Sequence, residues 1–484
     1  MSRDSLTAPS ARRWLVLALT VLAQFMVILD IAVVNVALPS IKHDLHFSQA
    51  SLEWVITSYS IIFGGTLLLG GRLADLLGRR RLFVAGVAVF MVSSLLSGLA
   101  WSAGSLIVFR SLQGLGGALL SPAALSIVAT TFTEGRERNV ALGVWGAASG
   151  SGGAAGVLLG GLLTSYAGWT WIFFVNLPLG AIVLAATPFL LRESRAELAH
   201  RHFDLKGAAA ITAGLMALSY SIARAAGHGW TNAVTLGILG AAALLIAAFV
   251  AIESRSPAPL LPLRIFRTRT VSAANATMVT IGAVGFAQFF LLTLYLQQVL
   301  HYSAIRTGVA FLGITVVIAT ASNYAQKLTT RFGPQRLLVL GSLLSAFAAL
   351  LYAQTPLHGD YFTNVLPGFV IGGVGLAFSF VPVTIAGLTG VAPADAGVAS
   401  GLINTTRQVG GSVGLALVTT IAATASARYG TGPAALNHGF HVALYTLAGI
   451  SVLGASFALA VGRPRRAEEA PLVPEPVYVL KEAA

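Results

Sequence analysis

Two charged side chains interrupt long apolar stretches of the sequence. Asp30 lies in "VILDIAVVNVALPSI" (27–41) and Arg110 lies in "IVFRSLQGLGG" (107–117). Inside a bilayer, a charged group is tolerated only in a packed interior or beside water. A carboxylate that is alternately dehydrated and exposed to water can bind a proton on one side and release it on the other. Asp30 is therefore a candidate proton carrier; the alternative is a static buried pair that joins two helices.

The depth of the two side chains favours contact between them. At the helical rise of about 1.5 Å per residue, Asp30 lies roughly 24 Å along a helix counted from Trp14. Arg110 falls at a similar depth in its own apolar stretch. We therefore expect Asp30 and Arg110 to influence each other's charge.

Arg407, in "NTTRQVGG" (404–411), is a third charge inside an apolar stretch. It could bind an acidic group of a small molecule or balance Asp30, or its side chain could snorkel to the lipid headgroups. We expect a cavity for a small molecule, and the candidates to line it are Asn35, Tyr59, Gln113, Asn404 and Arg407.

The composition requires these side chains to be carried by membrane helices. The chain has 484 residues, of which 56% are hydrophobic and 10% charged, with a mean hydropathy of +0.81. Windows of about 20 apolar residues predict fourteen membrane helices. The first is too long for the apolar part of a signal peptide, so we interpret it as a helix. The ranges are 14–38, 51–71, 82–101, 105–130, 139–163, 171–191, 206–226, 232–252, 271–299, 305–327, 336–354, 362–389, 398–422 and 438–462.

The basic residues gather in alternate connecting segments. The formal net charge is +13, and the distribution follows the positive-inside rule rather than forming a surface for nucleic acid. This pattern places both termini in the cytoplasm and predicts no nucleic-acid partner. We expect Asp30 to be the only carboxylate well inside the bilayer.

One segment of the chain is repeated. "GRLADLLGRRRL" (71–82) and "QKLTTRFGPQRL" (326–337) carry identical residues at four corresponding positions. The matched pairs are Leu73/Leu328, Gly78/Gly333, Arg81/Arg336 and Leu82/Leu337. Duplicated halves are typical of transporters, although chance similarity is an alternative. We expect an N-terminal segment at 1–13, a six-helix half at 14–191, two inserted helices at 206–252, a second six-helix half at 271–462 and a disordered tail at 463–484.

Several motifs together resemble one transporter family. "GRLADLLGRRR" resembles the loop signature of the major facilitator superfamily. "LDIAVVNVALPSI", "FRSLQGLGGALLSP", "LLGGLLTSYAGWTWIFFVNLPLG" and "GLINTTRQVGGSVG" are similar to its fourteen-helix drug:proton antiporter branch. The resemblance covers about residues 10–462. It departs at Val157, where proline is usual, and at Leu76, where a basic residue is common.

The resemblance implies roles for particular residues. It assigns Asp30 and Arg110 to proton coupling on cavity-lining helices. It also implies that the loop signature latches the cytoplasmic side to the second half, where Asp75 could meet the N-terminus of the helix near "APADAGVAS". Asp395 would compete there as an N-cap. The latch residues are Gly71, Asp75, Gly78, Arg79 and Arg80, although the arginines could serve membrane topology alone.

A stripe of glycines follows the predicted fifth helix. Gly152, Gly156 and Gly160 recur every four residues, with Gly161 adjacent. Small residues on one face permit close helix contact and, without Cβ atoms, sliding as two halves rock. Plain tight packing is the alternative.

Enzyme motifs are missing from the sequence. It contains no P-loop lysine motif, HExxH or GxSxG, and no cysteine, so we expect no enzyme and no cofactor or metal.

Without an ATP site, transport would draw on an ion gradient. We predict a monomeric, proton-coupled exporter of small lipophilic compounds; the alternatives are an importer, a passive channel or a non-transporting membrane sensor. Abundant Ala, Gly and Arg suggest a bacterial cytoplasmic membrane. Candidates to form an apolar cavity wall are Phe286, Phe289, Phe290, Tyr295, Phe378 and Phe380.

Overall fold

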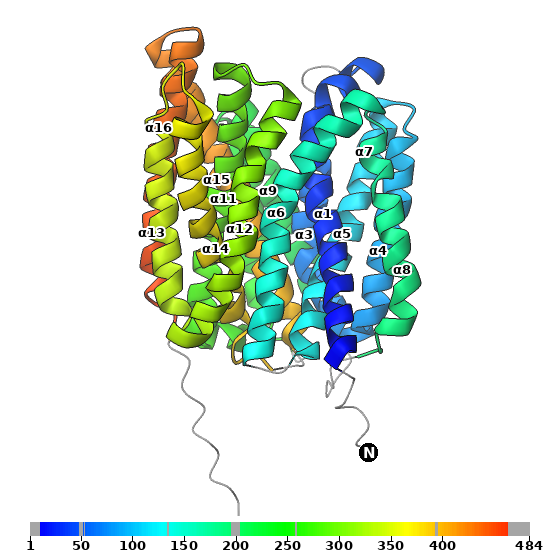
Figure 1. Cartoon of the computed structure of the whole chain (residues 1–484). Helices are drawn as coiled ribbons and strands as arrows, with labels where there is room; N and C mark the ends of the chain where they lie inside the picture. Colours follow the sequence, from blue (N-terminus) through cyan, green and yellow to red (C-terminus); the bar gives the residue numbers. More distant parts are fainter. Residues whose placement is uncertain are drawn as a thin grey trace, which may run out of the picture.

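The protein is a bundle of long, roughly parallel helices (Figure 1). The computed structural model describes residues 10–47, 52, 54–132, 135–194, 204–256, 259–392 and 395–462. Every regular element among them is helical. The tail at 463–484, for which the sequence predicts disorder, and residues 1–9 lie outside the described residues.

The N-terminal half contains six membrane-length helical segments, the last of which is broken into α7 and α8. They are α1 (Ser10–Asp44), α3 (Trp54–Leu77), α4 (Arg79–Gly98), α5 (Ala103–Thr131), α6 (Arg136–Tyr166), α7 (Trp171–Phe174) and α8 (Asn176–Leu190). Local signals begin several of these helices. Ser102, for example, forms a capping box with Ser105 at the start of α5.

A helical hairpin and a second set of six helices follow. The hairpin is α9 (Leu205–His228) and α10 (Ala233–Glu253), and a short helix, η2 (Leu263–Arg267), leads to the second half. That half is α11 (Arg269–Leu294) with η3 (Tyr295–Val299), α12 (Ala304–Phe332), α13 (Pro334–Tyr352), η4 (Tyr361–Val365) with α14 (Leu366–Leu388), α15 (Ala396–Tyr429) and α16 (Pro433–Ala458).

The two halves use the same packing at corresponding places. Gly78 and Gly333, the matched glycines of the repeated segment, both adopt positive φ angles, 113° and 83°, just before a helix begins. Beyond them, Gly86 of α4 lies against α5 at Gly116, as Gly375 of α14 lies against α13 at Gly341. In each half, a missing Cβ lets two backbones approach closely. The repeat detected in the sequence is therefore a repeat of structure.

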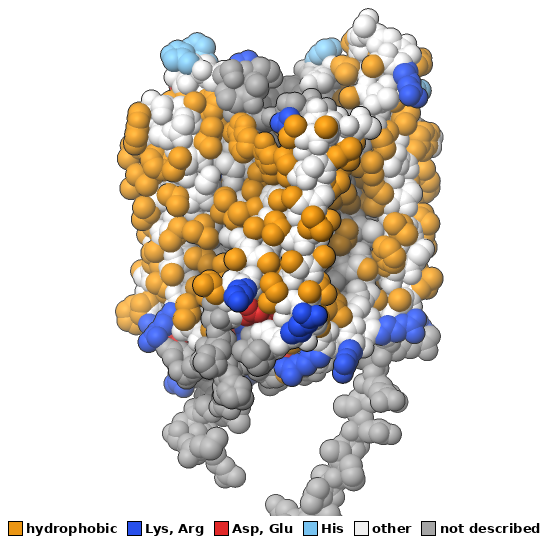
Figure 2. All heavy atoms as spheres, turned by 180° about the vertical axis from the view of Figure 1, so that it is seen from behind, with side chains coloured by type: hydrophobic (Ala, Val, Ile, Leu, Met, Phe, Trp, Pro, Cys, Tyr) orange, Lys and Arg blue, Asp and Glu red, His pale blue; other side chains and the backbone are white. Residues whose placement is uncertain are grey.

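Thirteen helices among the described residues are long and apolar enough to cross a membrane. α6 is a further helix of 31 residues, and its middle, rich in Gly, Ser and Ala, is less apolar than the others. It packs between α1 and α12, so it completes the fourteen long helices that we expected. Hydrophobic side chains cover the middle of the surface, while Lys and Arg gather toward one end (Figure 2).

We call that end the basic end. There Arg12 donates to the carbonyl of Leu190, at the end of α8, and Arg13 pairs with Glu137, at the start of α6, at 3.0 Å. α16 ends at the same side, where Gln335 of α13 donates to the carbonyl of Leu459. The first and last described helices therefore have their outer termini at one end of the bundle.

The inserted hairpin bridges the two halves. α9 packs on both α3 and α15, and Gly65 of α3 allows close approach to Met216 of α9. α10 packs mainly on α9 and is mostly exposed to the surroundings of the bundle. The hairpin thus lies over the line where α3 meets α15.

Besides Asp30, the carboxylates of Asp75 and Glu253 are buried in the bundle. Asp75 is 0% exposed because α3 continues to Leu77, six residues beyond the predicted end. Glu253, at the end of α10, is 4% exposed. Both lie toward the basic end, where the sequence pattern had suggested solvent-exposed connections.

Candidate functional site

Asp30 and Arg110 form a buried ion pair between α1 and α5. Arg110 Nη1 lies 2.6 Å from Asp30 Oδ2, and the two side chains are 0% and 1% exposed. The Arg110 guanidinium also donates from Nε to the carbonyl of Val55 on α3 and lies 4.4 Å from the ring centroid of Tyr59. The structure therefore brings together the two charges that the sequence placed at similar depth.

Amide side chains surround the second oxygen of Asp30. Oδ1 accepts from Gln113 Nε2 at 2.8 Å and from Asn176 Nδ2 at 3.0 Å. Both amides also donate to the hydroxyl of Ser94 on α4, and Gln113 Oε1 accepts from Arg110. Arg110 and Gln113, three residues apart, share one face of α5. We name Asp30, Ser94, Arg110, Gln113 and Asn176 the Asp30 centre.

This geometry fits the ionised form of Asp30. An ionised carboxylate only accepts hydrogen bonds, and here three donors point at it. A proton on Oδ1 would compete with the two amide donors, and a proton on Oδ2 would remove the negative charge that holds the Arg110 guanidinium. Proton binding therefore weakens the contacts that tie α1 to α5 and α8. The Asp30 centre can in this way link a proton to a change in helix packing.

Glycines of α6 pack against the residues that flank Asp30. Added Cβ atoms would lie 2.8 Å from Ile28 at Gly152, 2.6 Å from Ala32 at Gly156 and 2.9 Å from Val33 at Gly160. Gly161 is also buried. The glycine stripe thus allows α6 to run directly beside the segment of α1 that carries the carboxylate.

Asp75 joins the two halves at the basic end. Its Oδ1 accepts from Arg79 Nη2 at 2.9 Å and from the backbone N of Gly397 at 3.2 Å, and Oδ2 accepts from Val398 N at 3.1 Å. The N-terminus of α15 carries a partial positive charge that favours this carboxylate. Gly71 completes the contact, because a Cβ there would lie 2.4 Å from the Gly397 carbonyl oxygen.

The remaining members of the loop signature have different surroundings. Arg79 is buried and donates to Ser126 Oγ at 2.7 Å. Arg80 uses its backbone N to donate to Glu193, and the exposed Arg81 lies 3.7 Å from the same carboxylate. Asp395 occupies the expected N-cap position of α15, but its side chain makes no capping hydrogen bond and pairs with Arg264 at 3.1 Å instead.

The residues proposed for a substrate cavity fall into three groups. Tyr59, Asn404 and Arg407 lie where α3 meets α15, and Arg407 Nη2 is 3.4 Å from Asn404 Oδ1. Gln113 belongs to the Asp30 centre. Asn35 is exposed and donates to the carbonyl of Ile31 in its own helix.

Buried polar atoms gather in the first of these groups. The Tyr59 hydroxyl and Arg407 Nε are buried and have no hydrogen-bond partner. The guanidinium of Arg407 lies 5.7 Å from the ring centroid of Phe380, so it does not snorkel to the surface. Unpaired donors between two packed halves are suited to a polar group of a bound molecule.

The aromatic residues expected in a cavity wall mostly lie elsewhere. Phe289 stacks on Phe311 in the core of the second half, and the Tyr295 hydroxyl donates to the carbonyl of Pro356. Phe286 packs on Gly411, and Phe290 is 38% exposed on the surface of α11. Only Phe380 among them is recorded beside Arg407 in the described residues.

Sequence reasoning missed two members of the Asp30 centre. Asn176 follows the break between α7 and α8, and Ser94 lies inside an apolar helix. A neutral amide or hydroxyl in an apolar stretch is common in membrane helices and gives little signal. The polar Asn176 between "IFFV" and "LPLG" was the one local hint.

These features define a class of protein. The fold has two repeated six-helix halves, hydrogen bonds between them at one end, and a buried ion pair inside one half. This combination is typical of a membrane transporter that works by rocking its halves.

The comparisons with known proteins confirm this class. Residues 20–415 match the Major Facilitator Superfamily, and the chain belongs to this family. It is 41% identical over 464 residues to the puromycin resistance protein pur8 of Streptomyces alboniger, covering 93% of this chain and 91% of the relative. It is 38% identical to the cephamycin export protein CmcT of Amycolatopsis lactamdurans, covering 87% of each.

A solved structure agrees on the fold. The proton:xylose symporter XylE superposes with a TM-score of 0.67 at 14% identity, covering 94% of this chain and 97% of that one. The protein is therefore a multi-pass membrane transporter and not an enzyme.

Proposed function

We propose that this protein exports small lipophilic compounds, antibiotics among them, in exchange for protons. The observation that carries the proposal is the Asp30 centre, where a buried carboxylate accepts three hydrogen bonds that are strengthened by its charge and that protonation would weaken. Relatives named for antibiotic resistance and export support the substrate class and the direction. The protein acts as a monomer in a bacterial cytoplasmic membrane with the basic end in the cytoplasm.

Alternating access follows from the contacts between the halves. At the basic end, Asp75 holds α3 to α15, and Asn139 of α6 donates to Thr330 of α12 at 2.9 Å. In this conformation the passage is closed there. Protonation of Asp30 from the opposite side would rearrange α1 beside the glycine stripe of α6, and the contacts at the basic end would then open to admit substrate.

Tyr59, Asn404 and Arg407 form the polar part of the substrate site. The ring of Tyr59 covers the Arg110 guanidinium, while its hydroxyl lies beside Gly117 with no hydrogen-bond partner. Tyr59 thus separates the Asp30 centre from the side of the bundle where Arg407 lies. A molecule bound at Tyr59 and Arg407 would sense a movement of Arg110.

A transport assay tests the proposal. Inverted membrane vesicles that contain the protein should lose an imposed pH gradient when a substrate found in a susceptibility panel is added. Vesicles without the protein should keep the gradient. Substrate accumulation that is unaffected by collapsing the gradient would contradict proton exchange, and proton movement in the same direction as substrate would favour an importer.

A further inference from the structure

The inserted hairpin ends in two carboxylates that the Asp30 centre does not use. Asp204 precedes α9, and its Oδ1 accepts from the backbone N of Gly207 at 2.8 Å. Glu253 is the last residue of α10, and its Oε1 accepts from Leu261 N at 2.6 Å. The second oxygen of each carboxylate is buried and has no hydrogen-bond partner.

These two unpartnered oxygens lie close together. A Cβ added to Gly207 would be 2.9 Å from Asp204 Oδ2 and 3.0 Å from Glu253 Oε2, so the oxygens are at most about 6 Å apart. Glu253 is 4% exposed, so water cannot replace the missing partner freely. The backbone approaches this point without a side chain of its own, because residue 207 is glycine.

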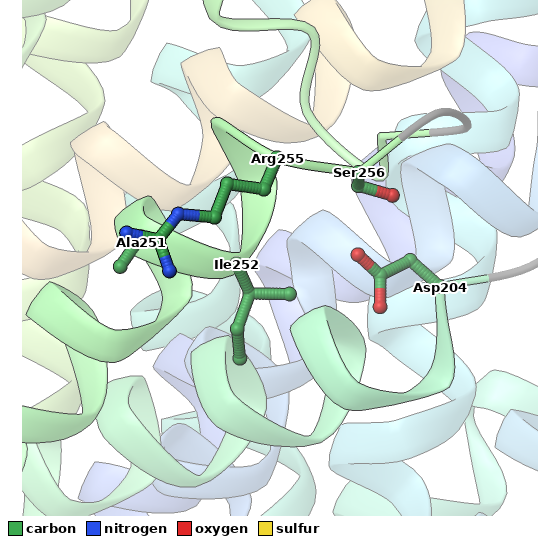
Figure 3. A pocket seen from close by; sticks show the side chains of 5 residues that line it. All are labelled: Asp204, Ala251, Ile252, Arg255 and Ser256. Carbon is green, nitrogen blue, oxygen red and sulfur yellow. The ribbon is translucent and has the colours of Figure 1, made fainter.

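Nearby cations compensate the charge of the pair only in part. Arg72 of α3 lies within electrostatic range of Glu253, but it is shared with Asp75 and Asp395, and no ion pair within 4.0 Å joins it to Glu253 among the described residues. Arg264 of η2 pairs with Asp395. In Figure 3, the Arg255 guanidinium points away from Asp204, and Lys206 is exposed.

Two carboxylates this close in a buried place cannot both remain ionised at low cost. A single proton on the pair removes one of the two like charges and so lowers the cost of burying both carboxylates. A pocket of about 330 Å³, lined also by Ile252, Arg255 and Ser256, reaches Asp204, the member of the pair nearer to the surface (Figure 3).

The pair is connected to the contact between the halves. Leu260 and Leu261, which follow α10, share one buried apolar cluster with Leu68 of α3 and Val398 of α15. Val398 N is a donor to Asp75, and Arg264 ties the same connecting segment to Asp395, just before α15. Separation of α3 from α15 must therefore disturb the segment that Glu253 holds.

We infer that Asp204 and Glu253 form a proton-binding site that favours closure of the basic end. The closed state buries the pair and binds one proton; opening exposes the pair to water and releases it. Closure is then favoured by acid at the basic end and weakened as the pH there rises. For one proton, the ratio of open to closed protein changes by up to about tenfold per pH unit. The inference rests on the proposed Asp75 latch but not on proton exchange at Asp30.

Thiol labelling tests this inference, because the chain has no cysteine. Ala399→Cys places a thiol in α15, two residues beyond Gly397, at a position that is 1% exposed. Its labelling rate is divided by that of Leu459→Cys, which is 62% exposed at the same end, so that the pH dependence of the thiol itself cancels. We expect this ratio to rise several-fold between pH 6 and pH 8.

Substitutions of Asp204 and Glu253 test whether these two carboxylates cause the pH dependence of the labelling ratio. Glu253→Gln and Asp204→Asn should each flatten the pH response, whereas Glu137→Gln, an exposed acid at the same end, should leave it unchanged. A ratio that is independent of pH in the wild type, or a pH response in Glu253→Gln and Asp204→Asn as large as that of the wild type, would overturn the inference. Asp75→Ala in the Ala399→Cys protein separates the proposals: if it does not raise labelling, the latch and this inference both fail.

Infrared difference spectroscopy supplies a measurement that does not depend on labelling. The closed wild type should show a protonated-carboxyl stretch that titrates with pH and disappears in Asp204→Asn and Glu253→Gln. Persistence of the band in both variants would also overturn the inference.

Discussion

Asp30 is held by more hydrogen bonds than an ion pair requires. Arg110, Gln113 and Asn176 all donate to it from two other helices, and Ser94 orients both amides. Removing one member of a buried ion pair typically costs about 3–5 kcal/mol, because the remaining charge is left without a partner. The Asp30 centre therefore ties α1 to α5 and α8 and stabilises the first half.

Asp30→Asn should abolish proton-driven export. The amide cannot carry a proton, and it leaves Arg110 without a counter-charge in a place that is 1% exposed. Substrate uptake into inverted vesicles under a pH gradient measures the effect, with a loss of at least about tenfold expected, equivalent to about 1.4 kcal/mol.

Asp44→Asn is the matched control on the same helix, since Asp44 is half-exposed at the C-terminal end of α1, away from the Asp30 centre. Transport by Asp30→Asn at the wild-type rate with an intact response to the gradient would show that Asp30 is structural. The proton site would then lie elsewhere.

At the scale of elements, close contacts between helices depend on missing side chains. α6 runs beside α1 at Gly152, Gly156 and Gly160, and α3 meets α15 at Gly71 and Gly397. Movement of one helix along another requires such smooth surfaces. Both proposed moving contacts of the protein, at the Asp30 centre and at the basic end, are therefore built on glycine.

Gly156→Ala should impair transport and lower stability. The new Cβ would lie 2.6 Å from Ala32 Cβ and 2.9 Å from the Leu29 carbonyl oxygen, so α6 must shift away from α1. Overpacking of this kind typically costs about 1–3 kcal/mol. Thermal unfolding of the purified protein and vesicle transport measure the two effects.

Gly153→Ala provides the control on the same helix, because nothing lies within 4 Å of its added Cβ. Equal behaviour of the two variants would show that close packing at Gly156 contributes nothing.

Asp75→Ala should shift the protein toward the state that is open at the basic end. The substitution removes the hydrogen bonds to Gly397 N and Val398 N, and loss of about 1–2 kcal/mol changes the population several-fold. Faster labelling of Ala141→Cys and Ala399→Cys, both buried at that end, reports the shift.

Arg81→Ala is the comparison within the same loop, since Arg81 is largely exposed and pairs only weakly with Glu193. If the buried cysteines label no faster in Asp75→Ala than in Arg81→Ala, Asp75 does not act as a latch.

At the scale of the whole molecule, the charge in the middle of the bundle is unbalanced. Among the described residues there, one carboxylate, Asp30, accompanies two guanidinium groups, Arg110 and Arg407, while Asp75 and Glu253 lie toward the basic end. Asp30 is enclosed by its own half and is not free to receive a cationic substrate. Arg407 therefore sets the charge that a bound molecule meets.

Neutral or weakly anionic lipophilic substrates should be preferred over dicationic ones. A cation needs negative charge in the cavity to offset the cost of losing its water. Competition among a neutral hydrophobic drug, a monovalent dye and a divalent cationic biocide measures the preference. Strong protection against the divalent compound that is lost in Asp30→Asn would contradict the charge argument.

The sequence alone determined the elements and much of the chemistry. Fourteen long helices, two repeated halves and the positions of Asp30, Arg110 and Arg407 follow from apolar length and charge spacing, which are local properties of the chain. The approach of Asp75 to α15 was implied by the resemblance of its loop to a known family signature, together with the helix N-terminus expected near "APADAGVAS".

The tertiary structure alone decided which side chains meet. Gln113 lies in the Asp30 centre and not beside Arg407, and Asn176 and Ser94 reach that centre from other helices. Asp204 and Glu253 lie close together at the two ends of the hairpin. Such meetings depend on the rotation and crossing of helices that are distant in sequence, and an apolar helix carries little pattern to fix its rotation. In a chain this hydrophobic, the positions of polar groups along each helix are encoded locally, but their partners are fixed by packing.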